Sequence, residues 1–144
     1  MVDSDMGLNY RIPAYITRVV QDEDTKNFSA QLWFAEPFDW AGDKPVIKEN
    51  QELFIYECHV GMAQEKEAVG TYKEFEENIL PRVKDGGYNA VQMMAIQEHP
   101  YYGSFGYHVS NFFAASSRFG TPEELKSLIK TAHEMGIAVI LDIV

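Results

Sequence analysis

The chain has 144 residues, of which 46% are hydrophobic and 13% aromatic, and its formal net charge is −10. This length suits about one domain, and the apolar content favours a packed core over disorder. Acids outnumber basic residues and no basic cluster is present, so we expect neither nucleic acid nor a membrane as a partner. A neutral ligand such as a sugar is compatible with this charge.

The sequence also bears on the cellular compartment. Cys58 is the one cysteine, so no intrachain disulfide can form, which favours a reducing environment. The N-terminus has acids where a signal peptide has basic residues, and the longest apolar run, residues 137–141, is too short to cross a membrane. We expect a cytoplasmic protein.

Residues 1–50 differ from the rest of the chain in their pattern of polar and apolar residues. Residues 14–20 and 28–34 alternate in polarity and flank a polar turn at 21–27, which predicts an antiparallel hairpin. Two strands alone cannot bury a core. Residues 36–50 contain two prolines and a glycine, a composition typical of a linker.

From residue 51 onward, strand and helix patterns alternate. Residues 53–60 predict a strand. Thr71 then begins a helix as its N-cap, with Glu74 at the capping-box position. Pro81 is expected to kink or end this helix. Its apolar face is formed by Tyr72, Phe75, Ile79 and Val83.

The pattern repeats once more. Residues 89–96 predict a strand buried on both faces, and a long loop, 97–120, follows. A second helix is predicted by Thr121 as N-cap, Pro122 at the first helical position and Glu124 at the capping-box position. Residues 137–144 form the third predicted strand. The buried stripe of the second helix is expected to comprise Leu125, Leu128, Ile129 and Ala132.

Strands and helices in this order predict a parallel sheet in an α/β fold. An open doubly wound sheet and an eight-stranded (β/α)8 barrel both fit. The open sheet usually carries a glycine-rich phosphate loop after its first strand, and residues 58–63 have none. We therefore expect a partial TIM barrel, consisting of its first three strands and two helices.

A barrel of this kind places its site at the carboxyl ends of the strands. That rule selects His59, the loop 97–120 and Asp142. Aromatic rings in the loop suit the C–H faces of a sugar, although they would equally fill a small core beneath the loop. Tyr107, between a glycine and a polar residue, is the better ligand candidate. The remaining rings are Tyr101, Tyr102, Phe105, Phe112, Phe113 and Phe119, of which Phe112 and Phe113 are expected to be packing residues.

Residues 106–144 resemble the part of the α-amylase superfamily of glycoside hydrolases that joins the second barrel strand to the third. The shared features are a Gly-Tyr pair, the motif FFA, the motif RFGT before a helix, and an aspartate on the third strand. Residues 51–144 are similar, more closely, to the eukaryotic-type branching enzymes of that superfamily. Residues 11–40 resemble, more weakly, the end of the β-sandwich that precedes the barrel in those enzymes.

This resemblance implies a division of the chain into three parts. Residues 1–35 would end a carbohydrate-binding β-sandwich, 36–50 would be the linker, and 51–144 would begin the catalytic barrel. The chain is accordingly expected to be an N-terminal fragment that stops in the third barrel strand.

The resemblance also implies roles for particular residues. Tyr107 matches a tyrosine that stacks on the sugar at the cleavage subsite, and Asp142 matches the aspartate of the first conserved block. His108 stands where amylases commonly have aspartate, and it is a further binding candidate. Glu98 and His99 are expected either to line the donor groove or to brace the loop.

The implied chemistry is a retaining double displacement with two carboxyl groups about 5–5.5 Å apart. In the superfamily these groups follow later barrel strands, so we expect no catalytic residue, metal or organic cofactor in this chain. The implied parent is a glycogen or starch branching enzyme, which transfers a cut α-1,4-glucan chain to a 6-hydroxyl. Alternatives are a non-catalytic α-glucan-binding module, another hydrolase of the superfamily, or an open α/β binding domain.

Two further expectations concern contacts. The partner is expected to be an α-1,4-glucan, and the isolated chain is expected to self-associate through the open edges of strands 53–60 and 137–144. Cys58 and His59 are neighbours in a strand and point to opposite faces, so they are not expected to form a thiol–imidazole pair.

Overall fold

The computed structural model describes residues 2–144 and shows three parallel strands at its centre. These are β5 (Ile55–Cys58), β6 (Ala90–Met93) and β9 (Ala138–Leu141), in the order β5-β6-β9. Both pairs are parallel, and Glu57, Gln92 and Ile140 share one row of the register. The predicted parallel sheet is confirmed, although each strand is shorter than its apolar pattern.

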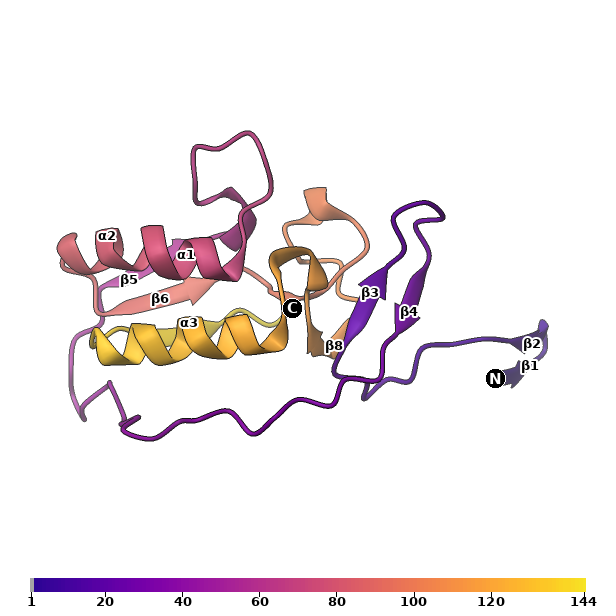
Figure 1. Cartoon of the computed structure of the whole chain (residues 1–144), viewed down its shortest axis with the longest axis horizontal. Coiled ribbons are helices and arrows are strands. Elements are labelled where there is room, and N and C mark those ends of the chain that lie inside the picture. The colour runs from indigo at the N-terminus through magenta and orange to yellow at the C-terminus, as the bar shows by residue number, and fades with distance from the viewer. Residues whose placement is uncertain (1) are drawn as a thin grey trace.

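Helices α1 (Tyr72–Asn78), α2 (Leu80–Asp85) and α3 (Pro122–Glu134) cover one face of this sheet (Figure 1). Thr71 and Thr121 both close the predicted capping boxes, because each side chain accepts from the backbone N–H three residues on. The first predicted helix is divided at Ile79, next to Pro81. Proline lacks the N–H that would continue the ladder, so the expected break is confirmed.

The core lies between the sheet and the helices. Alternation along β5 and β6 turns Cys58, Val91 and Met93 toward the helices. Glu57 and Ile55, on the opposite face of β5, stay exposed. The largest fully buried side chains of the core are Tyr72, Phe75, Phe119, Leu80, Met93, Leu128 and Ile137.

The region 97–120 contains more structure than the sequence predicted. A short strand, β7 (Gln97–Glu98), pairs antiparallel with β8 (Asn111–Ala115), with an irregular register between its two residues. Single 3-10 turns occur at Tyr102–Ser104 and Ser117–Phe119, and a third, Val60–Met62, follows β5. A two-residue strand has no measurable periodicity in sequence, which explains why residues 97–120 were predicted to be a loop.

Two hairpins precede the sheet. The first, β1 (Val2–Ser4) with β2 (Gly7–Asn9), was not predicted. The second, β3 (Val19–Gln21) with β4 (Phe28–Ala30), confirms the predicted hairpin with shorter strands.

The second hairpin is docked on the sheet-and-helix unit. Arg18 donates from Nη1 to the Gly120 carbonyl at 2.7 Å and lies over the Trp33 ring, 5.0 Å from its centroid. Trp33 Nε1 donates to Glu123 of α3 at 3.0 Å. The hairpin therefore contacts the point where the long loop enters α3.

Residues 36–50 have no helix or strand, and they run along α3 toward β5 (Figure 1). Lys130 donates to the Asp39 carbonyl at 2.8 Å, and Asp43 Oδ1 lies 2.9 Å from Nδ1 of His133. The segment expected to be a linker is thus fastened to α3. The division of the chain into domains at residues 35 and 50 stays a prediction.

Across residues 2–144, every helix falls short of the length and apolarity that a bilayer crossing requires.

We predict that the isolated 144-residue chain self-associates. The outer strands β5 and β9 have unpaired backbone edges, and apolar side chains beside them, Phe54 and Ile143, are 60% and 67% exposed. Sedimentation velocity is expected to show association that grows with concentration. Ile143→Lys places a charge at the edge without touching the core, and it is expected to shift the chain toward monomer. A monomer that persists at tens of micromolar in the parent chain would contradict this prediction.

Candidate functional site

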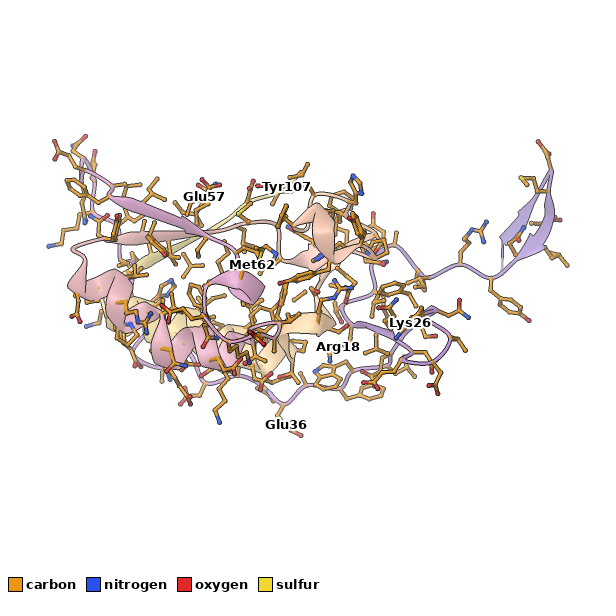
Figure 2. All side chains as sticks on the ribbon, turned by 90° about the horizontal axis from the view of Figure 1, so that it is seen from above. Arg18, Lys26, Glu36, Glu57, Met62 and Tyr107 are labelled. Atoms are coloured by element: carbon orange, nitrogen blue, oxygen red, sulfur yellow. The ribbon has the colours of Figure 1, made fainter. Side chains whose placement is uncertain are left out.

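The carboxyl ends of the three parallel strands form one rim, because parallel strands end at the same edge of a sheet. The loop after β6 and residue Asp142 after β9 both lie at this rim. Seen from above, Glu57 and Tyr107 lie along the same side of the chain (Figure 2).

The structure joins two residues that the sequence analysis selected separately. Tyr107, in the long loop, donates its hydroxyl to Oδ2 of Asp142 at 3.0 Å. Asp142 continues the β6–β9 pairing, since its N–H donates to the Met93 carbonyl at 3.3 Å. One strand thus supplies the carboxylate, and the loop after its neighbour supplies the ring.

Tyr107 is placed by the residue before it. Gly106 has φ of 91°, and a Cβ at this position would lie 1.8 Å from the Ala95 carbonyl oxygen. Only glycine tolerates both the left-handed backbone and this close approach. The Tyr107 N–H then donates to the Ser104 carbonyl at 3.0 Å, so the backbone on both sides of the ring is fixed.

The Tyr107 hydroxyl is held neutral. The pKa of Tyr107 is raised, mainly by the hydrogen bond to Asp142. Burial and the charges of Asp142 and Glu57 raise it further. A neutral phenol goes on donating to the carboxylate at physiological pH. Asp142 keeps further acceptor sites, which suit the hydroxyl groups of a sugar.

Glu57 is a rim residue that the sequence analysis did not select. It lies on the exposed face of β5, and its charge acts on Tyr107. The sequence could have indicated this position: if Cys58 faces the core, its neighbour Glu57 faces the opposite side of the strand. The rim therefore carries two carboxylates near one tyrosine ring.

His108 follows Tyr107 and is exposed. Within residues 2–144 its imidazole has no hydrogen-bond partner. The proposed binding role of His108 stays a prediction.

Glu98 and His99 are buried, with 1% and 0% of their surface exposed. Glu98 accepts hydrogen bonds from the loop, including the Ser117 N–H at 2.8 Å. His99 Nδ1 lies 2.8 Å from the Gln97 carbonyl. Of the two roles expected for this pair, the structure favours loop bracing, because neither side chain reaches a surface that could contact a sugar.

Several loop rings form the small core that was the alternative interpretation. Tyr102, Phe105 and Phe119 meet the His59 ring edge-to-face at 5.5–5.8 Å between centroids. Burial, and then the nearby His99, lowers the pKa of His59, so this imidazole is neutral at physiological pH. Cys58 has its thiol near the Gln92 carbonyl, and burial raises its pKa to about 12.

The expectation that Phe112 and Phe113 are packing residues is wrong for this chain. They lie next to each other on β8 and are 55% and 58% exposed. Phe113 contacts Tyr15 of the docked hairpin at 5.0 Å between ring centroids.

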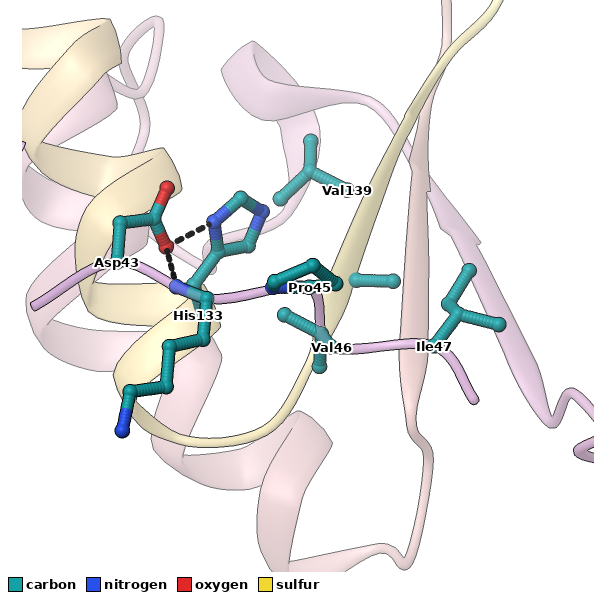
Figure 3. A pocket seen from close by; sticks show the side chains of 8 residues that line it. Asp43, Pro45, Val46, Ile47, His133 and Val139 are labelled. Carbon is teal, nitrogen blue, oxygen red and sulfur yellow. Dashed lines mark hydrogen bonds and ion pairs between the residues drawn. The ribbon is translucent and has the colours of Figure 1, made fainter. Parts of the chain in front are cut away.

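A hollow near the start of β9 lies away from the rim (Figure 3). It measures about 500 Å³ and is lined by residues of the 36–50 segment, by His133 and by Ala138 and Val139 at the start of β9. In it His133 is already tied to Asp43. Among the described residues no three His, Cys, Asp or Glu side chains are grouped as metal ligands.

Comparison with known protein families agrees with this arrangement. The model of the α-amylase catalytic domain matches residues 62–144, which is more than half of the chain. This chain belongs to the α-amylase catalytic-domain family. The matched region includes the long loop, α3 and the strand that carries Asp142, so the family match disfavours an open α/β binding domain.

Individual relatives narrow the comparison. The chain is 53% identical over 143 residues to a 1,4-alpha-glucan-branching enzyme of Saccharomyces cerevisiae, covering 94% of this chain and 20% of that protein. A Dictyostelium discoideum enzyme of the same name is 52% identical, with 96% and 20% covered. An Arabidopsis thaliana chloroplastic/amyloplastic form, numbered 2-2, is 50% identical, with 99% and 18% covered. The chain thus spans about one fifth of the length of these relatives.

We predict that Gly106→Ala destabilises the loop far more than Gly87→Ala. Both glycines have a left-handed backbone, but a Cβ at Gly87 meets nothing within 4 Å, whereas one at Gly106 overlaps the Ala95 carbonyl. Gly87→Ala is expected to cost about 1–2 kcal/mol from backbone strain alone. Denaturant unfolding should show a clearly larger loss for Gly106→Ala. Equal losses would mean that the close approach to Ala95 does not fix the loop.

Proposed function

We propose that this chain is part of a 1,4-α-glucan branching enzyme and supplies the tyrosine and one carboxylate of its sugar-binding site. The observation that carries this proposal is the hydrogen bond between Tyr107 and Asp142 at the rim of a parallel sheet. Relatives named as branching enzymes match over nearly the whole chain. The reaction would cut an α-1,4-glucan and transfer the cut chain to a 6-hydroxyl.

In this proposal β5, β6 and β9 are the first three strands of an eight-stranded barrel. Their parallel order, with helices on one face, supports that assignment. The exposed face of β5, which carries Glu57, would then look into the barrel. The β3–β4 hairpin would close a carbohydrate-binding β-sandwich, and its contacts with Gly120 and Glu123 would join that module to the barrel.

The proposed substrate is a neutral glucan chain. The Tyr107 ring would stack on the C–H face of a glucose unit, and Asp142 would accept a hydrogen bond from a sugar hydroxyl while it holds the tyrosine. Glu57, whose charge acts on Tyr107, and His108, the residue after Tyr107, would extend these contacts. A site of acceptors and rings suits a ligand that brings many O–H donors and no charge.

The nucleophile and the acid/base would come from barrel strands beyond this chain. Retention requires two carboxyl groups about 5–5.5 Å apart across the bond. At the rim Asp142 is already bound to Tyr107, which suits a positioning role in the charged network. The cytoplasmic location also stays a prediction, since the Arabidopsis relative is named as chloroplastic/amyloplastic.

A chimera tests the proposal directly. Replacing the matching fifth of the Saccharomyces relative by this chain is expected to preserve branching activity, because half of the replaced residues are identical. The measurement is the shift of the iodine–amylose spectrum together with α-1,6 linkages counted by NMR. The isolated chain, assayed alongside, is expected to show no activity. A folded chimera without activity, or an isolated chain with activity, would contradict the proposal.

Within the chimera, Tyr107→Ala is expected to lower kcat/KM by roughly tenfold or more while the melting temperature changes little. Stacking strengthens as the sugar ring distorts toward the transition state. Tyr88→Ala is the matched control, since Tyr88 is 36% exposed and lies at the amino end of β6, opposite the rim. Should Tyr107→Ala reduce the melting temperature but leave the kinetics unchanged, the ring would be a packing residue.

A further inference from the structure

Glu98 makes an unusual number of contacts for one buried side chain. Its carboxylate accepts four hydrogen bonds: from Ser116 Oγ at 3.2 Å, from Ser117 N at 2.8 Å, from Ser117 Oγ at 3.0 Å and from its neighbour His99 N at 3.1 Å. Its backbone carbonyl accepts two more, from Ser110 N at 2.8 Å and Ser110 Oγ at 3.0 Å. One residue of β7 thus bonds to both arms of the long loop.

These hydrogen bonds offset the free-energy cost of burying the Glu98 carboxylate. Within residues 2–144 no ion pair joins this carboxylate to a Lys, Arg or His side chain. A buried carboxylate without a cation is costly unless its acceptor sites are filled. Ser116 and Ser117 of the loop donate to these acceptor sites. If the loop moved away, the buried carboxylate would lose these hydrogen bonds.

The same bonds define the base of the segment that presents Tyr107. Ser110 lies three residues after Tyr107, and Ser117 lies where the loop turns toward α3. Arg118 reinforces this closure by donating to the His99 carbonyl at 3.3 Å. The ring is therefore carried on a segment that is fixed at Gly106 by steric contact and at Ser110 and Ser117 by Glu98.

We propose that Glu98 is a positioning residue for the sugar site: its buried carboxylate holds the loop in the one conformation in which Tyr107 reaches Asp142. This inference rests on the proposed function for the activity that Tyr107 serves. Glu98 would touch no sugar. It would act on the reaction only through the placement of the tyrosine ring.

A glutamine at this position tests the idea with little change in shape. Its carboxamide has one acceptor oxygen and an NH2 group, and the NH2 group cannot accept from the Ser117 N–H. In the chimera, Glu98→Gln is expected to lower kcat/KM by about tenfold. In the Tyr107→Ala background the same change is expected to cost less than about twofold, because the group that it positions is already absent.

Glu76→Gln is the matched control. Glu76 also accepts two side-chain hydrogen bonds, from Ser127 Oγ at 3.1 Å and Thr131 Oγ1 at 2.6 Å, but these join α1 to α3 away from the rim. It is expected to leave kcat/KM unchanged. Ser117→Ala, which removes one hydroxyl donor, is expected to give a smaller loss than Glu98→Gln and serves if the glutamine variant fails to fold.

Amide hydrogen exchange supplies a readout that needs no activity. Glu98→Gln, or Ser117→Ala in its place, is expected to speed exchange at residues 104–117, and Glu76→Gln is not. An inactive chimera with this exchange pattern would count against the proposed function while supporting the positioning role. Additive losses in the double variant, or unchanged loop exchange, would overturn the positioning role.

Discussion

The contact between the Gly106 backbone and the Ala95 carbonyl sets the geometry of the rim. A side chain at residue 106 would overlap that oxygen, so the loop can lie against the end of β6 only with glycine there. From that position the next residue, Tyr107, reaches Asp142. Asp142 is fixed independently by the pairing of β9 with β6. The two residues therefore come from the ends of two adjacent strands, and the pairing of these strands fixes their relative position.

The first 50 residues contribute to the same geometry from outside. Arg18 holds the carbonyl of Gly120, where the loop ends, and Trp33 holds Glu123 in the first turn of α3. Asp43 meets His133 near the other end of that helix. α3 is thus fastened at both ends by a segment whose composition is typical of a hairpin and a linker. The loop is held by Glu98 from inside and by Arg18 from outside.

The sequence predicted those features of the fold that depend on residues close together in the chain. The capping boxes at Thr71 and Thr121 and the break at Pro81 depend on residues within one turn, and all three are present in the structure. Asp142 was selected by its place at the end of a predicted strand and Tyr107 as a ring of the long loop, and the resemblance pointed to both. Their contact was not predicted, since no spacing rule links residues 35 positions apart. The three bonds from serines to the Glu98 carboxylate were not predicted, because Ser116 and Ser117 lie 18 and 19 residues away and show no sequence pattern.

The most direct test of the account is a crystal structure of the chimera with a bound α-1,4-linked glucose oligomer. The account predicts a glucose ring stacked on the face of Tyr107, a sugar hydroxyl within hydrogen-bond distance of Asp142, and the Tyr107–Asp142 bond retained. Glu98 is expected to stay buried beneath the loop and out of contact with sugar. An oligomer bound elsewhere, with the Tyr107 ring covered by protein or turned away from Asp142, would contradict the account.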